Sequence, residues 1–156
     1  MGDRISFTTV NDDETSRNDA RQEEARQILE AIHRDFADVR REGCVTLHET
    51  VVIDRYGSDH ERLAARELDT DTHWWEVRDE WIETIGGVGG LAFLDDAGFR
   101  YYLPAHMSYW LRTGVEPGFL SYYIAGSRKH RYRLFNAAQR ATIGRLVKFV
   151  HRGERW

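Results

Sequence analysis

The chain has 156 residues, of which 41% are apolar and 31% charged, and its 22 basic and 26 acidic side chains leave a net charge of −4 at pH 7. A chain of this length buries roughly 68 to 70% of its unfolded surface, which predicts one globular domain whose core needs no metal or disulfide. The single cysteine, Cys44, excludes an internal disulfide and a zinc site built from several cysteines. No apolar run approaches the ~20 residues of a membrane span and the N-terminus lacks a signal-peptide pattern, so a cytoplasmic location is expected.

Residues 1–19 are polar and show no helical period, which predicts a flexible polar N-terminal arm. From residue 21 to residue 41, apolar side chains recur every three or four positions, the spacing of one face of a helix. Gly43 follows this stretch and can close the helix in the left-handed conformation. We therefore expect residues 20–156 to form a single globular helical domain that begins with this helix.

Two segments with the Ser/Thr-x-x-Glu spacing of a capping box, Thr46–Glu49 and Ser58–Glu61, predict two short helices. The first of them also shows the alternation of β-branched and apolar residues that is typical of a strand, so a strand remains the alternative there. In the second helix, over residues 59–68, Leu63 and Leu68 are expected to face the core.

A further short helix is expected to begin near Asp79 and to end at the glycine run of residues 86–90, because each glycine costs a helix about 1 kcal/mol. Another is predicted over residues 118–125. The last helix starts at Asn136, which forms an Asn variant of the capping box with Gln139.

The most apolar block, residues 91–113, predicts a long helix that Asp95 caps, Pro104 kinks and Gly114 closes. The alternative for this block is one small β-hairpin near residues 91–103, followed by a separate helix. The chain is thus predicted to be a mainly α, single compact domain of six or seven helices.

No catalytic or metal-binding constellation stands out in the sequence. The spacing of Asp69, Asp71, His73 and Glu80 is similar to that of calcium ligands in an EF-hand loop, but Trp74 occupies the position where the tight turn needs glycine. The seven histidines do not pair at helical spacing. We therefore predict no metal site, no cofactor and no catalytic residues, which favours a protein that is not an enzyme.

Basic side chains are concentrated near the C-terminus. Residues 128–155 carry nine Arg or Lys against one acid, a local charge of +8, whereas the 13 basic and 25 acidic side chains of the remainder sum to −12. Three interpretations of this segment stay open. Its cations pair with acids of the same chain, bind a protein partner with an acidic surface, or bind the phosphates of a nucleic acid.

Fourteen of the 19 aromatic residues lie between Trp74 and Phe135. Most of them are expected in the core, since aromatic side chains bury large areas. Adjacent residues cannot both face the same side of a helix or strand, so one member of each aromatic pair should lie nearer the surface: Trp74 and Trp75, Tyr101 and Tyr102, Tyr109 and Trp110, Tyr122 and Tyr123. Exposed Tyr, Trp and Arg together are typical of protein-binding surfaces.

The chain resembles an uncharacterised bacterial domain family of unknown function over about residues 44–151. The central motif FL-x4-FR-x-YLPA is carried by Phe93, Leu94, Phe99, Arg100, Tyr102, Leu103, Pro104 and Ala105. A C-terminal F-x3-QR helix with Gln139 and Arg140, and an earlier block of Leu47, His48 and Glu49, complete the resemblance. The family implies a small cytoplasmic domain and carries no activity over to this chain.

These features favour a protein-binding module that neutralises or regulates a partner, for example one of the immunity (antitoxin-like) type, with no membrane partner. The expected contact residues are Trp74, Trp75, Tyr122, Tyr123, Arg128, Arg131 and Arg133. The alternative is a small-ligand-binding protein or enzyme with a pocket built from His48, Glu49, Arg100, Tyr102 and His106, in which His48, Glu49 and Arg100 would be the catalytic groups. A third interpretation is nucleic-acid binding through the basic C-terminal segment.

Overall fold

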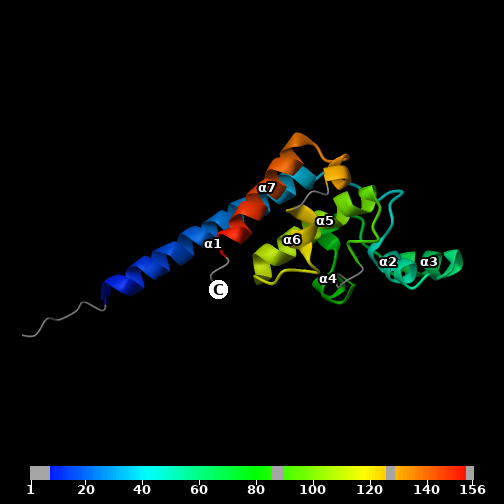
Figure 1. Cartoon of the computed structure of the whole chain (residues 1–156), viewed down its shortest axis with the longest axis horizontal. Coiled ribbons are helices and arrows are strands. Elements are labelled where there is room, and N and C mark those ends of the chain that lie inside the picture. The colour runs from blue at the N-terminus through cyan, green and yellow to red at the C-terminus, as the bar shows by residue number, and fades with distance from the viewer. Residues whose placement is uncertain (1–7, 86–89, 126–128, 154–156) are drawn as a thin grey trace, which may run out of the picture.

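The computed structural model describes residues 8–85, 90–125 and 129–153 (Figure 1). The fold is mainly α, as predicted, with seven α-helices, two 3₁₀-helices and no strand in these ranges. In chain order the elements are α1 (Thr8–Phe36), α2 (Leu47–Asp54), α3 (Asp59–Arg66), η1 (Trp74–Glu76), α4 (Asp79–Ile85), α5 (Asp96–Thr113), α6 (Leu120–Ile124), η2 (Lys129–Tyr132) and α7 (Ala137–His151). The strand over residues 45–53 and the hairpin over 91–103 are both wrong, because α2 and α5 occupy these segments.

The long helix α1 differs from the prediction at both ends. It begins at Thr8, so residues 8–19 are helical where an irregular arm was expected. The sequence gives no period there because residues 12–20 are all exposed, and only a helix with a buried face shows an apolar stripe. The helix ends at Phe36 instead of residue 41, where the chain turns and the Val39 N–H donates to the Phe36 carbonyl at 3.1 Å. Gly43 adopts the predicted left-handed conformation, with φ of 73°, but in the following loop.

Helix α5 is the centre of the core. It packs against α1, η1, η2 and α4, and eleven of its 18 residues are buried. For this reason Tyr101 and Tyr102 are both fully buried, against the expectation that one of them would lie nearer the surface. Asp95 caps the helix through a hydrogen bond of 2.8 Å from the Gly98 N–H, and Gly114 closes it with φ of 73°, both as predicted.

Helix α7 lies alongside the C-terminal half of α1, while the N-terminal half of α1 extends beyond the rest of the fold (Figure 1). At the opposite end of the molecule, α2 and α3 form a pair that we call the α2–α3 hairpin, residues 47–68. The predicted capping box is complete at the start of α3, whereas at α2 Glu49 accepts the Thr46 N–H but the Thr46 hydroxyl makes no cap hydrogen bond. Leu63 and Leu68 do not face the core, however: they are 63% and 58% exposed, because no other element covers that side of α3.

Most of the predicted glycine loop, residues 86–89, lies outside the described residues. Within the described ranges, none of the helices combines the length and the apolar character that crossing a membrane requires.

Candidate functional site

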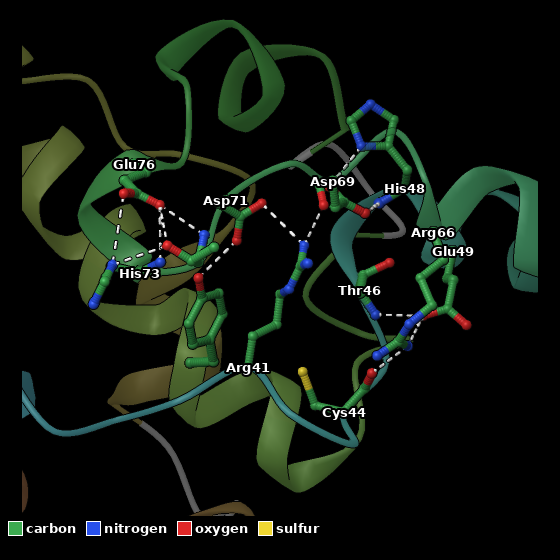
Figure 2. A network of polar contacts seen from close by, with 12 residues as sticks. Arg41, Cys44, Thr46, His48, Glu49, Arg66, Asp69, Asp71, His73 and Glu76 are labelled. Carbon is green, nitrogen blue, oxygen red and sulfur yellow. Dashed lines mark hydrogen bonds and ion pairs between the residues drawn. The ribbon is translucent and has the colours of Figure 1, made fainter.

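A buried polar cluster lies where the chain enters α2 and leaves α3 (Figure 2). The carboxylates of Asp69 and Asp71, just after α3, are fully buried. Nη1 of Arg41, from the segment before α2, donates to the Asp69 carbonyl and lies 3.3 Å from Oδ1 of Asp71. The Tyr101 hydroxyl on α5 donates to Oδ2 of Asp71 at 2.7 Å. Loss of hydration on burial raises the pKa of Asp71, although the bonds from Tyr101 and Arg41 act in the opposite direction.

His48, in the first turn of α2, is held by Asp69 at two points. Its backbone N–H donates to Oδ2 at 3.0 Å, and its Nδ1 lies 2.7 Å from Oδ1. A carboxylate only accepts hydrogen bonds, so in the neutral ring the proton sits on Nδ1 and Nε2 is an acceptor. The ring also meets the edge of Trp81, with centroids 5.2 Å apart. The orientation of His48 is therefore set by its neighbours, as for a base held by a carboxylate.

Glu49 lies beside this cluster but serves a different set of partners. Its Oε2 accepts the Thr46 N–H at 2.7 Å, which is one half of the capping box, and Nη1 of Arg66 at 2.8 Å. The same Arg66 atom donates to the carbonyl of Cys44 at 2.7 Å. Burial raises the pKa of the Cys44 thiol to about 12, so the thiolate needed for nucleophilic attack is not available near neutral pH.

Together these residues tie the base of the α2–α3 hairpin to the body of the fold, and we call them the anchor cluster: Arg41, Thr46, His48, Glu49, Arg66, Asp69, Asp71 and Tyr101. Buried polar groups of this kind stabilise one arrangement of the chain when each finds a partner. The described residues contain no group of three or more metal-ligating side chains. The anchor cluster is thus a fixed base for the hairpin.

The remaining residues of the alternative pocket do not join an open site. Nη1 of Arg100 donates to the carbonyl of Leu134 at 2.8 Å and is not paired with Glu49. Tyr102 is fully buried, and its hydroxyl lies near Arg41 and the Leu47 backbone without a well-formed hydrogen bond to either. Burial lowers the pKa of His106 to about 4, and its neutral ring lies 2.9 Å from the Tyr102 carbonyl through Nδ1. The five residues therefore do not form the pocket that the sequence analysis offered as an alternative.

Three of the predicted contact residues are in the interior. Trp74 is 1% exposed and donates from Nε1 to the carbonyl of Phe36 at 3.0 Å. Tyr123 is a buried residue of α6, and the Arg131 guanidinium is buried over the ring of Phe99. Arg131 also donates to two backbone carbonyls, of Leu91 and Leu94. These side chains are buried because they fill the core or satisfy loop carbonyls, so they are not part of an accessible surface.

Of the other predicted contact residues, the three that the structure describes are exposed. Trp75 is 46% exposed and stacks on His73 with centroids 4.4 Å apart, and Tyr122 is 57% exposed. Arg133 forms an ion pair with Asp96. Arg128 lies outside the described residues.

Several cations of the basic segment bind groups of the same chain. Arg140 donates to the carbonyls of Tyr132 and Phe135, and Arg152 pairs with Glu24 on α1. With Arg131 and Arg133, four of the segment's described arginines thus have partners within the fold. Two of these four, Arg133 and Arg152, pair with acids as the first of the three interpretations states, whereas Arg131 and Arg140 bind neutral carbonyls.

A groove of about 370 Å³ runs between α2 and α3. Its lining residues are His48, Val51, Val52, Arg55, Glu61, Ala64, Ala65 and Leu68. Nη2 of Arg55 and Oε1 of Glu61 pair at 3.0 Å at its edge. His48 connects this groove to the anchor cluster. Sequence reasoning missed both features. Leu63 on the short helix α3, and Leu68 just after it, were a usable signal for an apolar surface that the chain does not cover.

The fold and this site define a class of protein: a small all-helical domain that presents a hairpin fixed by a buried polar cluster. A family of unknown function, DUF6714, matches residues 24–155, and the chain belongs to this family. This match confirms the resemblance to a family of unknown function that the motifs indicated. Comparisons with curated proteins and with solved structures find no match.

Proposed function

We propose that the domain is a protein-binding module that neutralises or regulates a partner, as immunity-type proteins do, and that the α2–α3 hairpin makes the contact. The observation that carries this proposal is that α3 buries none of its residues. The hairpin exposes four large apolar side chains, Val51, Tyr56, Leu63 and Leu68. Exposed apolar side chains carried by two adjoining helices and their flanking turns favour an interaction site there.

Rigidity of the hairpin supports the same proposal. An interface that is already ordered loses less conformational entropy when it binds. Hydrogen bonds from His48 to Asp69 and from Arg66 to Glu49 hold α2 and α3 in place without a partner. The hairpin can therefore keep its apolar side chains exposed and remain folded.

The chemistry of the hairpin indicates what its partner offers. The groove between α2 and α3 has apolar walls, which suit an apolar side chain of the partner. Three exposed carboxylates of the hairpin, Asp54, Asp59 and Glu67, form no ion pair with any described residue. A partner with an apolar anchor and basic residues around it fits this surface. An acidic partner was expected for the basic C-terminal segment, but several cations of that segment bind within the fold.

Site-specific photo-crosslinking in cells of the native source tests the proposal. A chain carrying p-benzoylphenylalanine at Leu63 should give one discrete adduct with another protein, and the further substitution Leu68→Asp should abolish it. Leu134, which is 40% exposed on a different part of the surface, is the matched control position and should give no adduct. Circular dichroism of each variant checks that the fold is kept. An adduct from Leu134 but none from Leu63 would place the contact elsewhere and refute the proposal.

A further inference from the structure

A second groove, of about 490 Å³, opens where α1, α7, the end of α5 and the beginning of α6 meet. Its volume falls within the range of roughly 300–1,000 Å³ that is usual for small-molecule sites. Trp110, Leu111 and Val150 supply apolar lining, and polar side chains of α1 and of the segment before α6 stand around it. It shares no lining residue with the groove of the α2–α3 hairpin.

One side of this groove carries a positioned cation. The guanidinium carbon of Arg21, on α1, lies 4.2 Å from the ring centroid of Phe149 on α7, a cation–π geometry. Gly153 lies directly against it, since a Cβ at that position would be 2.1 Å from Nη2 of Arg21. The ring and the glycine backbone together define where the guanidinium sits in the groove lining.

The segment between α5 and α6 contributes a positioned anion. Oε1 of Glu116 accepts the Ser121 N–H at 2.7 Å and also the Ser121 hydroxyl. Oε2 of the same carboxylate has no hydrogen bond to any described residue. The carboxylate is thus held by one oxygen, and the other can accept a hydrogen bond from a ligand.

We propose that this groove binds a small zwitterion with an apolar body, an α-amino acid with an aromatic or long apolar side chain. The carboxylate of the ligand meets Arg21, its ammonium group meets Oε2 of Glu116, and its side chain lies against Trp110. A cation and an anion provided by different elements around an apolar lining complement opposite charges on one compact molecule. This site is independent of protein binding by the hairpin.

Three probes that differ only in charge test the proposal: L-phenylalanine, L-phenylalaninamide, which lacks the carboxylate, and N-acetyl-L-phenylalanine, which lacks the ammonium group. Affinities are measured from ¹H–¹⁵N shifts of the groove amides, such as those of Gly114 and Ser121. L-Phenylalanine should bind at least about tenfold more tightly than either analogue, a difference of ~1.4 kcal/mol. Equal affinities for all three, or no shifts at about 10 mM, would overturn the proposal.

The substitution Glu116→Gln isolates the ammonium contact. Glutamine keeps a side-chain oxygen that can accept from Ser121, so the local structure is retained while the charge is lost. The variant should bind L-phenylalanine about tenfold more weakly and N-acetyl-L-phenylalanine as before. Glu80→Gln, an exposed carboxylate of α4 outside the groove, is the matched control and should change neither affinity. If Glu116→Gln weakens both probes equally, the carboxylate acts only on the structure and the assignment of the ammonium site fails.

Discussion

The adjacent residues Tyr101 and Tyr102 provide a matched test of the anchor cluster. Both side chains are fully buried on α5, and in each case replacement by phenylalanine removes a single oxygen atom. The Tyr101 hydroxyl donates to the buried carboxylate of Asp71 at 2.7 Å, whereas the Tyr102 hydroxyl lies near Arg41 and the Leu47 backbone without a well-formed hydrogen bond to either. The two substitutions should therefore have very different effects on the free energy of unfolding.

Tyr101→Phe should lower the free energy of unfolding by about 2 kcal/mol, because hydrogen bonds to charged groups contribute roughly 1.5–3 kcal/mol and the carboxylate stays buried. For a chain of this length this corresponds to a fall in Tm of roughly 4–8 °C. Tyr102→Phe should lower the free energy of unfolding by less than about 1 kcal/mol, because its hydroxyl makes only loose contacts with Arg41 and the Leu47 backbone.

Urea unfolding followed by circular dichroism measures both variants, with unchanged m-values as the check that only stability differs. The pH dependence adds a second criterion. Burial raises the pKa of Asp71 in the folded state, so protonation of this carboxyl favours folding and its contribution to stability falls as pH rises through that pKa. The deficit of Tyr101→Phe should accordingly be larger at neutral pH than in acid, where Asp71 is neutral. Equal deficits for Tyr101→Phe and Tyr102→Phe would refute the assigned role of the Tyr101–Asp71 bond.

Three further substitutions test other parts of the fold. Burial lowers the pKa of His106 in the folded state from 6.5 to about 4. The stability that its neutral ring contributes is therefore fully present above pH 6.5 and is lost as pH falls toward 4. His106→Leu should flatten this part of the stability–pH curve, and an unchanged curve would contradict this reasoning. Arg131→Lys should lower the free energy of unfolding by about 2 kcal/mol, because an ammonium group cannot reproduce the planar fork that binds two carbonyls. Arg133→Gln should lower it by less than about 0.5 kcal/mol, because the ion pair of Arg133 is exposed. Similar values for both in thermal or urea unfolding would contradict the structural role assigned to Arg131. Gly98→Ala should lower the free energy of unfolding by more than about 1 kcal/mol, because the alanine Cβ would lie 2.5 Å from the Val45 carbonyl oxygen. A neutral effect in the same assay would show that the segment around Val45 moves away easily.

Helix starts could be predicted from the sequence because their signals are local. A cap involves one side chain and the backbone three residues later, so Thr46, Ser58, Asp95 and Asn136 mark the starts of α2, α3, α5 and α7 correctly. Residues 12–20 of α1 are all exposed and so show no apolar period, and there the prediction failed.

Burial depends on distant parts of the chain and could be predicted only in part. Trp74 and Trp75 divide between core and surface as expected, since η1 has a single covered side. Tyr101 and Tyr102 do not divide, because α5 is covered by other elements on several sides. Leu63 was expected to face the core but is exposed, because no other element covers the apolar face of α3. An apolar period therefore indicates that a face can be buried, and the packing of other elements decides whether it is.

The candidate site was missed for a related reason. Asp69 and Asp71 look like polar loop residues, and only the fold brings Arg41, His48 and Tyr101 to them from three other segments. Charge summed along the sequence is equally incomplete as a guide to partners. Arg131 counts fully toward the basic segment, yet its guanidinium is buried on backbone carbonyls.

The stability of the α2–α3 hairpin and its exposed surface depend on different residues. Hydrogen bonds of the anchor cluster, such as those from His48 to Asp69 and from Arg66 to Glu49, fix the hairpin at its base. Leu63 and Leu68 contribute little to the core because they are mainly exposed. The fold does not depend on these apolar side chains, because polar contacts elsewhere hold the hairpin. They can therefore be substituted, to match a different partner, at little cost in stability. This separation is what a binding surface requires, and it favours the hairpin over the basic segment, whose arginines also hold the fold together.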